Sequence, residues 1–155
     1  MRVLVNLFIL ITATFMAFAS YAQPNKRQAI LISRVGDNYF AYGEYEHAIR
    51  YYKVAFNEYP EYVEAQFQMA QCFRLMEQYD SAAHHYNLII SNGQDFRYPL
   101  SRYHMAMLQL QNGQKAAALD NLKAFRNLLV ENEQHELARF SDYYEQAKVE
   151  IDKIN

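Results

Sequence analysis

The stretch that decides the fold is AILISRVGDNYFAYGEYEHAIRYYKVAFNEYPEY, which runs from Ala29 to Tyr62. A second stretch of the same kind, VEAQFQMAQCFRLMEQYDSAAHHYNLII, begins at Val63, and a third, PLSRYHMAMLQLQNGQKAAALDNLKAFRNLL, begins at Pro99. The second start follows the first by 34 residues, and the third follows the second by 36. Self-similarity at a fixed period of this length is typical of repeat architectures. We therefore expect a stack of repeated units.

Matching positions of the three stretches carry residues of similar size. Small residues let two helices approach closely, and they recur at two positions of each unit: Gly36, Ala70 and Ala106 at the first, and Ala48, Ala82 and Ala118 at the second. Bulkier apolar residues follow at Tyr52, Tyr86 and Leu122. Between the halves of a unit, Gly43 and Gly113 suit the left-handed backbone of a tight turn after a helix, whereas Glu77 does not. The pattern predicts three helix hairpins.

The period and these positions resemble the tetratricopeptide repeat (TPR) family over roughly residues 29–129. The resemblance implies an all-α fold, an α-solenoid of three TPR hairpins at 29–62, 63–96 and 99–130, within a repeat region of 23–130. A polar insertion at 91–95 accounts for the 36-residue step and predicts a longer loop there. A plain helix bundle with coincidental spacing is the alternative.

The last segment, 131–155, carries one apolar stripe. Its members recur at steps of three and four residues: Leu137, Phe140, Tyr144, Ala147, Ile151 and Ile154. Such spacing predicts one amphipathic helix, and a solenoid needs a terminal helix with a polar outer face. We therefore expect a C-terminal capping helix over 131–155. The alternative is the first helix of a fourth repeat, in a fragment of a longer protein.

The first segment, 1–22, has the layout of a secretory signal peptide. Arg2 precedes an apolar run from Val3 to Phe18, and Ser20 and Ala22 stand where a signal peptidase prefers small residues. An uncleaved membrane anchor is the alternative, but the run is short for a full span. Cleavage before Gln23 would leave a protein without a stable membrane span. It would be secreted across the inner membrane to the periplasm or the outer membrane.

The stretches GDNYFAYGEYEHAIRYYKVAF, AQCFRLMEQYDSAAHHY and YPLSRYHMAMLQLQNGQKAAALDNLKAF are also similar to a narrower group. These are the N-terminal TPR modules of bacterial envelope proteins that continue into a β-propeller and an OmpA-like peptidoglycan-binding domain. The group includes a component of the type IX secretion and gliding machinery. Neither later domain follows in this sequence, and the lipoprotein cysteine of the group is absent. The resemblance therefore implies only an adaptor located in the cell envelope.

Motifs for catalysis or cofactor binding were sought and not found. The formal charge of −2 gives no basic surface for nucleic acid. There is no Gly-rich phosphate loop, and His84 and His85 are adjacent, so a helix would point them about 100° apart. Cys72, the single cysteine, is expected to be a small buried apolar residue. We expect no enzyme, no cofactor, no metal and no small-molecule substrate.

In the TPR family the first helix of each hairpin lines a concave groove that holds a partner. Carried over to this sequence, the resemblance implies these groove residues: Asp37, Phe40, Phe67, Gln71, Arg74, Tyr103 and Met107. Asp37 would repel a C-terminal carboxylate, which argues against the family's carboxylate clamp. Arg74 would pair either with an acidic side chain of a partner or with Asp37 across the groove. Met107 and Leu110 would alternatively pack against the final helix.

These observations predict a periplasmic or envelope adaptor that binds a partner protein or peptide in the concave TPR groove. The alternative is a structural or self-associating fragment of a larger TPR–propeller–OmpA-like envelope protein. In that case the last helix would dock on another copy or on a missing domain.

Overall fold

The computed structural model describes residues 25–131 and 134–154, and the side chains of residues 134–136 are not described. The predicted signal peptide at 1–22 lies outside these residues. No helix in the described part is long and apolar enough to cross a membrane.

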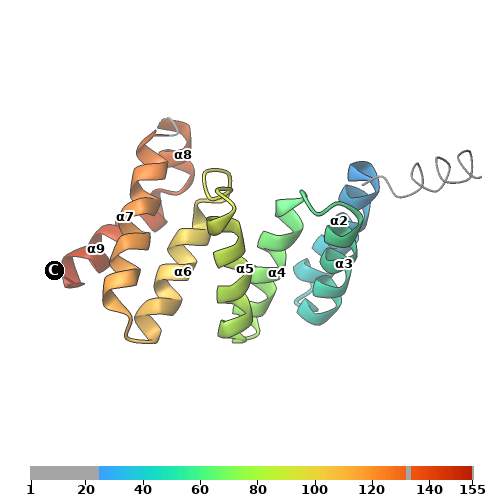
Figure 1. Ribbon diagram of the computed structural model, residues 1–155, viewed down its shortest axis with the longest axis horizontal. Helices are drawn as coiled ribbons and strands as arrows, with labels where there is room; N and C mark the ends of the chain where they lie inside the picture. The colour runs from blue at the N-terminus through green and yellow to red at the C-terminus, as the bar shows by residue number, and fades with distance from the viewer. Residues whose placement is uncertain (1–24, 132–133, 155) are drawn as a thin grey trace, which may run out of the picture.

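The described residues form helices joined by short turns, in the order α2 (Lys26–Ala41), α3 (Tyr45–Glu58), α4 (Val63–Leu75), α5 (Tyr79–Ser91), α6 (Leu100–Gln111), α7 (Lys115–Glu131), α8 (Gln134–Arg139) and α9 (Ser141–Ile154). The first six helices pair as hairpins α2–α3, α4–α5 and α6–α7, and each hairpin packs on the next through α3–α4 and α5–α6. The hairpins stand side by side in one elongated row, with α8 and α9 at the C-terminal end (Figure 1). The predicted all-α solenoid of three hairpins is confirmed.

The small residues lie where the two helices of each hairpin come closest. The alanines at both predicted positions are fully buried: Ala70 and Ala106 on α4 and α6, and Ala48, Ala82 and Ala118 on α3, α5 and α7. In the first hairpin Gly36 is buried, and a Cβ added there would lie 2.7 Å from the ring of Tyr52. Glycine at this position is therefore what allows the Tyr52 ring to lie against α2.

The core is divided along the solenoid rather than gathered at one centre. One cluster holds the first hairpin against α4, around Tyr52. A second, around Tyr86, joins α4 and α5 to α6. A third, around Leu122 and Phe125, joins α6 and α7 to α9. Each element is thus stabilised by its neighbours in sequence, as expected of a repeat protein.

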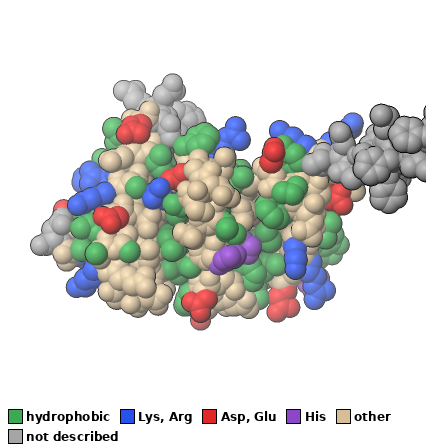
Figure 2. Space-filling model, in the orientation of Figure 1, with side chains coloured by type: hydrophobic (Ala, Val, Ile, Leu, Met, Phe, Trp, Pro, Cys, Tyr) green, Lys and Arg blue, Asp and Glu red, His purple; other side chains and the backbone are tan. Residues whose placement is uncertain are grey.

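Charged side chains form no continuous patch of one sign on the face shown in Figure 2. Lys, Arg, Asp and Glu side chains of both signs lie mostly toward the ends and edges of the solenoid. The middle of this face, over α5, shows hydrophobic and histidine side chains among uncharged polar ones. This face lacks the basic stripe that marks a nucleic-acid binder.

The turns within the hairpins share one backbone conformation. Gly43 and Gly113 have φ values of +76° and +72°, and Glu77 has +59° at the matching place in the second hairpin. In the sequence, Glu77 departs from the glycine that occupies this place in the other two hairpins. The structure shows that the turn keeps its left-handed geometry and that Glu77 adopts it.

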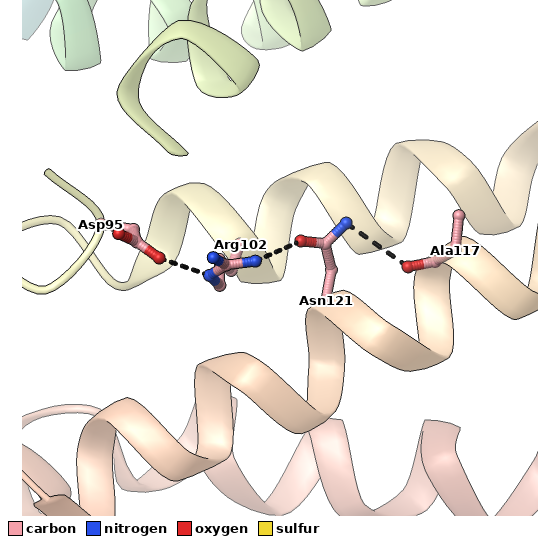
Figure 3. A network of polar contacts seen from close by, with 4 residues as sticks. All are labelled: Asp95, Arg102, Ala117 and Asn121. Atoms are coloured by element: carbon pink, nitrogen blue, oxygen red, sulfur yellow. Dashed lines mark hydrogen bonds and ion pairs between the residues drawn. The ribbon is translucent and has the colours of Figure 1, made fainter. Parts of the chain in front are cut away.

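The predicted polar insertion forms the loop between α5 and α6. Asp95 in this loop is buried, and its carboxylate accepts a hydrogen bond from Nε of Arg102 on α6. Nη1 of Arg102 also donates to Oδ1 of Asn121 on α7, at 3.1 Å. Figure 3 shows Arg102 between the other two side chains. The longer loop is therefore fixed to both helices of the third hairpin.

The C-terminal segment differs from the prediction of one helix over 131–155. Helix α7 continues to Glu131, and the remainder is divided into α8 and α9 with a break at Phe140. The break lets α9 turn back onto the third hairpin, where Ala147 and Ile151 are buried. The apolar stripe was predicted correctly, but one straight helix could not follow this path.

Candidate functional site

Two cavities lie beside the first helices of the second and third hairpins. The first, the Arg74 cavity, has a volume of about 350 Å³, and its walls include Arg74, Tyr79, Tyr103, His104, Met107 and Tyr143. The second, the Phe67 cavity, has a volume of about 330 Å³, and its walls include Glu64, Phe67, Tyr98, Leu100, Arg139 and Phe140. Both receive side chains from α4, α6 and the C-terminal segment.

Arg74 is held in place by a buried neighbour on its own helix. Its Nε and Nη2 atoms both donate to Oε1 of Gln71, at 3.2 and 2.9 Å. Gln71 is buried, so its amide is committed to the guanidinium. No carboxylate of the described residues lies within ion-pair distance of Arg74. Asp37 instead accepts a hydrogen bond of 2.9 Å from the Tyr52 hydroxyl, so the expected alternative of an Asp37–Arg74 pair is wrong.

Aromatic rings form the wall of the Arg74 cavity opposite α4. Tyr103 is only 6% exposed, and its hydroxyl donates to Oε1 of Gln146 on α9 at 2.6 Å. The Tyr143 ring of α9 packs edge-on against Tyr103, with 5.0 Å between centroids. This hydrogen bond and ring contact fix α9 along one side of the cavity.

His104 contributes no charge to the cavity at neutral pH. It is buried, and its ring stacks on Tyr86 with 5.6 Å between centroids. Burial, reinforced by repulsion from the Arg74 guanidinium, lowers the pKa of His104 to about 3. Arg74 is therefore the only formal charge among the residues that line this cavity.

The Phe67 cavity has a different character. Phe67 stacks on Tyr98 with 5.3 Å between ring centroids, and Leu100 and Phe140 extend this apolar wall. Glu64 at its edge accepts a hydrogen bond from Gln68 at 2.9 Å. Burial, together with the nearby Glu64 carboxylate, raises the pKa of the Tyr98 hydroxyl, which stays protonated.

The structure brings together part of the predicted groove set. Arg74, Tyr103 and Met107 line the Arg74 cavity, and Phe67 lines the other. Gln71, which lies between Phe67 and Arg74 on α4, is buried and lines neither cavity. Met107 and Leu110 also pack on the cluster that contains α9, as the alternative prediction stated.

The two predicted groove residues of the first hairpin line neither cavity. Asp37 is bonded to Tyr52, and Phe40 packs edge-on against Tyr45, with 5.5 Å between centroids, beside the first core cluster. The sequence also missed several wall residues: Tyr79, Tyr98, Phe140 and Tyr143. Phe140 belonged to the recognised apolar stripe, but nothing local in the sequence shows which groove that stripe faces.

The prediction about Cys72 can be compared with the structure. Cys72 is fully buried, and burial raises the pKa of its thiol to about 12, so it is an apolar core residue as predicted. Within residues 25–131 and 134–154, no three His, Cys, Asp or Glu side chains are grouped so that they could hold a metal ion.

Comparison with known proteins agrees with this architecture. The family model described as "Tetratricopeptide repeat" matches residues 39–101. The fold is similar to that of the type III secretion chaperone SycD of Yersinia enterocolitica, solved with a peptide of the translocator YopD. The TM-score is 0.72 with 20% identity, over 85% of this chain and 95% of that chain.

Other solved structures share the fold with similar TM-scores and sequence identities. PcrH of Pseudomonas aeruginosa has a TM-score of 0.69 and 15% identity, over 85% of this chain and 95% of that one. The TPR2AB domain of yeast Sti1, in a pHSP90 complex, has a TM-score of 0.69 and 21% identity, over 94% of this chain and 55% of that one. No curated protein sequence matches this chain. The fold is therefore that of a TPR-like solenoid. It consists here of three helix hairpins followed by α8 and α9.

Proposed function

We propose that this protein is an adaptor that binds an extended peptide segment of a partner protein along α4 and α6. The observation that carries the proposal is the placement of the two cavities. Phe67 and Arg74 are seven residues apart on α4, which is about 10 Å along a helix. Three residues of an extended chain span about the same distance, so one short peptide can reach both cavities.

Structural neighbours support a peptide as the partner. SycD was solved with a peptide of YopD, and the TPR2B domain of yeast Sti1 is described as a complex with pHsp70. These proteins are chaperones or peptide-binding TPR modules rather than enzymes. In this chain the same fold places two cavities beside α4 and α6, and binding of a peptide there requires no catalytic group.

The cell envelope is the proposed location. The signal-peptide pattern of residues 1–22 supports export, and the likeness to TPR modules of OmpA-like envelope proteins, including the type IX secretion component, supports an envelope partner. Cys72, the single cysteine, is compatible with an oxidising compartment, because its thiol is buried and has no second cysteine in the chain to pair with.

A pull-down from bacterial envelope extract tests the proposal. The bait is the wild-type chain or the Phe67→Ala, Arg74→Ala double variant, and we expect the double variant to lose most of the recovered partner. The matched control is Arg50→Ala, Val54→Ala on α3, which also removes one arginine and one apolar side chain. Both control residues are exposed, and neither lines a cavity described above. Equal recovery with both double variants, each checked for helix content by circular dichroism, would contradict groove binding.

Self-association is a second candidate, and an exposed apolar stripe on α2 favours it. Leu31 and Val35 on α2 are 54% and 38% exposed, and Tyr42, directly after α2, is 82% exposed. No helix packs before α2 in the described part. The outer face of α9 instead carries the ion pairs Lys148–Glu145 and Lys153–Glu150, as a capping helix should. Sedimentation velocity discriminates: a dimer that Leu31→Glu dissociates would support self-association, and a monomer at all concentrations would exclude it.

A further inference from the structure

The Arg74 cavity contains a positive charge that the described part of the chain does not neutralise. Its lining is otherwise aromatic, aliphatic or neutral polar, and buried His104 remains uncharged at neutral pH. We propose that this cavity binds the side-chain carboxylate of an aspartate or glutamate within the partner peptide. The inference rests on the proposed function, since it specifies the kind of peptide that the groove selects.

The charge balance of the cavity supports an acidic occupant. The groups that face Arg74 come from three other helices: Tyr79 and Tyr86 on α5, Tyr103, His104 and Gln111 on α6, and Tyr143 on α9. None of them is acidic. A partly buried guanidinium without a counter-ion is costly, and a carboxylate that enters the cavity would remove that cost.

The geometry of Arg74 also favours a carboxylate. Two of its N–H groups donate to Oε1 of Gln71, and these hydrogen bonds fix the plane of the guanidinium. The remaining N–H groups interact with the Tyr86 hydroxyl but with no carboxylate of the described residues. An arginine presents its donors as a fixed fork that matches a carboxylate. Gln71 therefore acts as a positioning residue for the proposed contact.

The second cavity specifies a further residue of the peptide. A peptide whose acidic side chain contacts Arg74 would place a residue about three positions away over the Phe67 cavity. The stacked Phe67–Tyr98 rings and Leu100 form an apolar wall that suits an apolar side chain, although Glu64, Arg97 and Arg139 also line this cavity. The expected motif is thus an acidic and an apolar residue about three positions apart.

A library of random octapeptides, acetylated and amidated so that neither end is charged, provides the probe. It is selected on the wild-type chain as purified from cells that express the full sequence. We expect enrichment of Asp or Glu at one position and of an apolar residue about three positions away. Replacing the acid of a selected peptide by its amide (Asp→Asn or Glu→Gln) should weaken binding about tenfold, as loss of a charge-assisted hydrogen bond does.

Variants of Arg74 assign that effect to the cavity. Arg74→Gln should bind the acidic and amide peptides equally, Arg74→Lys should recover part of the difference, and Arg74→Glu should prefer a peptide with Lys at that position. The Arg50→Gln variant on α3 should behave as wild type. Anisotropy titrations measure each affinity, and circular dichroism verifies that each variant keeps its helix content.

The outcomes separate this inference from the proposed function. If the selected peptides show no enrichment of Asp or Glu but bind the Phe67→Ala variant more weakly, the inference is overturned. The proposed binding of a peptide in the groove is then still supported. Peptides whose amide penalty is the same in wild type and Arg74→Gln overturn it as well, because the acid then binds elsewhere. Failure to select any peptide, or binding unaffected by both Phe67→Ala and Arg74→Gln, contradicts the proposed function and the inference together.

Discussion

Glu77 shows how one residue bears the strain of a repeated turn. Its φ of +59° matches the glycines of the other two hairpins, although its side chain makes this conformation unfavourable by about 1–2 kcal/mol. The turn keeps its shape because the N–H of Gln78 donates to the carbonyl of Phe73, as the N–H of Glu44 donates to that of Tyr39. The packing of the hairpin therefore imposes the backbone on an unsuitable residue.

Replacing this residue should stabilise the protein. Glu77→Gly removes the left-handed strain but adds chain entropy to the unfolded state, so the net gain should be about 0.5–1 kcal/mol. Urea denaturation measures the change, and Gly43→Ala serves as the reverse control because it introduces strain at the matching turn. A loss of stability with Glu77→Gly would show that the side chain makes a contact that outweighs the strain.

His104 makes stability depend on pH. Its pKa is lowered to about 3 in the folded protein, against an ordinary value of 6.5, so between these values the unfolded chain binds a proton that the folded chain does not. This contribution to stability is complete above about pH 6.5 and is lost as the pH falls toward 3, at a slope of up to about 1.4 kcal/mol per pH unit. His85, whose pKa is lowered by burial and by nearby His84, acts in the same direction.

The variant His104→Phe should flatten this dependence, since phenylalanine keeps a ring between Tyr86 and Tyr143 but binds no proton. Unfolding free energies measured at pH 4 to 7 should fall less steeply for the variant than for wild type. Parallel curves would show that another group is responsible. Restricting the comparison to the difference between the two proteins cancels the shared titration of surface carboxylates.

At the scale of elements, the loop between α5 and α6 is held by a polar network as well as by the stacking of Tyr98 on Phe67. The Asp95 and Arg102 side chains are 12% and 25% exposed, so their pair is largely shielded from water. Asn121 of α7 extends the network by donating from Nδ2 to Oε1 of Gln109 on α6, at 2.9 Å. One buried carboxylate thus fixes the entry to the third hairpin.

Breaking this pair should cost far more than breaking a surface pair. Asp95→Ala leaves a shielded guanidinium without its counter-ion and should destabilise the protein by about 2 kcal/mol. Lys148→Ala, in the exposed pair with Glu145, should change stability far less, because solvent screens an exposed ion pair. Chemical denaturation of both variants gives the comparison, and similar costs for the two would exclude a special role for the loop network.

The same scale shows what the sequence could and could not predict. The hairpins were predictable because their spacing and small residues, such as Ala70 and Ala82, are local features that recur. The break at Phe140 was not, because it is imposed by the way α9 packs on α6 and α7. For the same reason Tyr143 was missed as a cavity residue, whereas Arg74 was found from its position within a repeat.

At the scale of the molecule, the divided core means that stability is shared between neighbours. Helix α9 covers the third cluster, which includes Phe125 and Leu129, but makes none of the main contacts of the first two hairpins. A solenoid of this kind is expected to respond to damage locally before it responds globally.

Ending the chain after Phe140 tests this expectation. Without α9, the amides of α6 and α7 should exchange hydrogen faster because their cluster becomes exposed, while those of α2 and α3 should keep most of their protection. Hydrogen exchange followed by mass spectrometry resolves the helices separately. A uniform loss of protection over all the helices would instead indicate one cooperative unit.

The placement of Arg74 also bears on how such a protein could change its partner over evolutionary time. Phe67, Tyr103 and Met107 line the cavities and at the same time pack in core clusters, so mutations there would alter binding and stability together. Arg74 belongs to none of these clusters. Exchange of its charge would therefore be the least constrained route to a new preference, with the apolar part of the groove inherited unchanged.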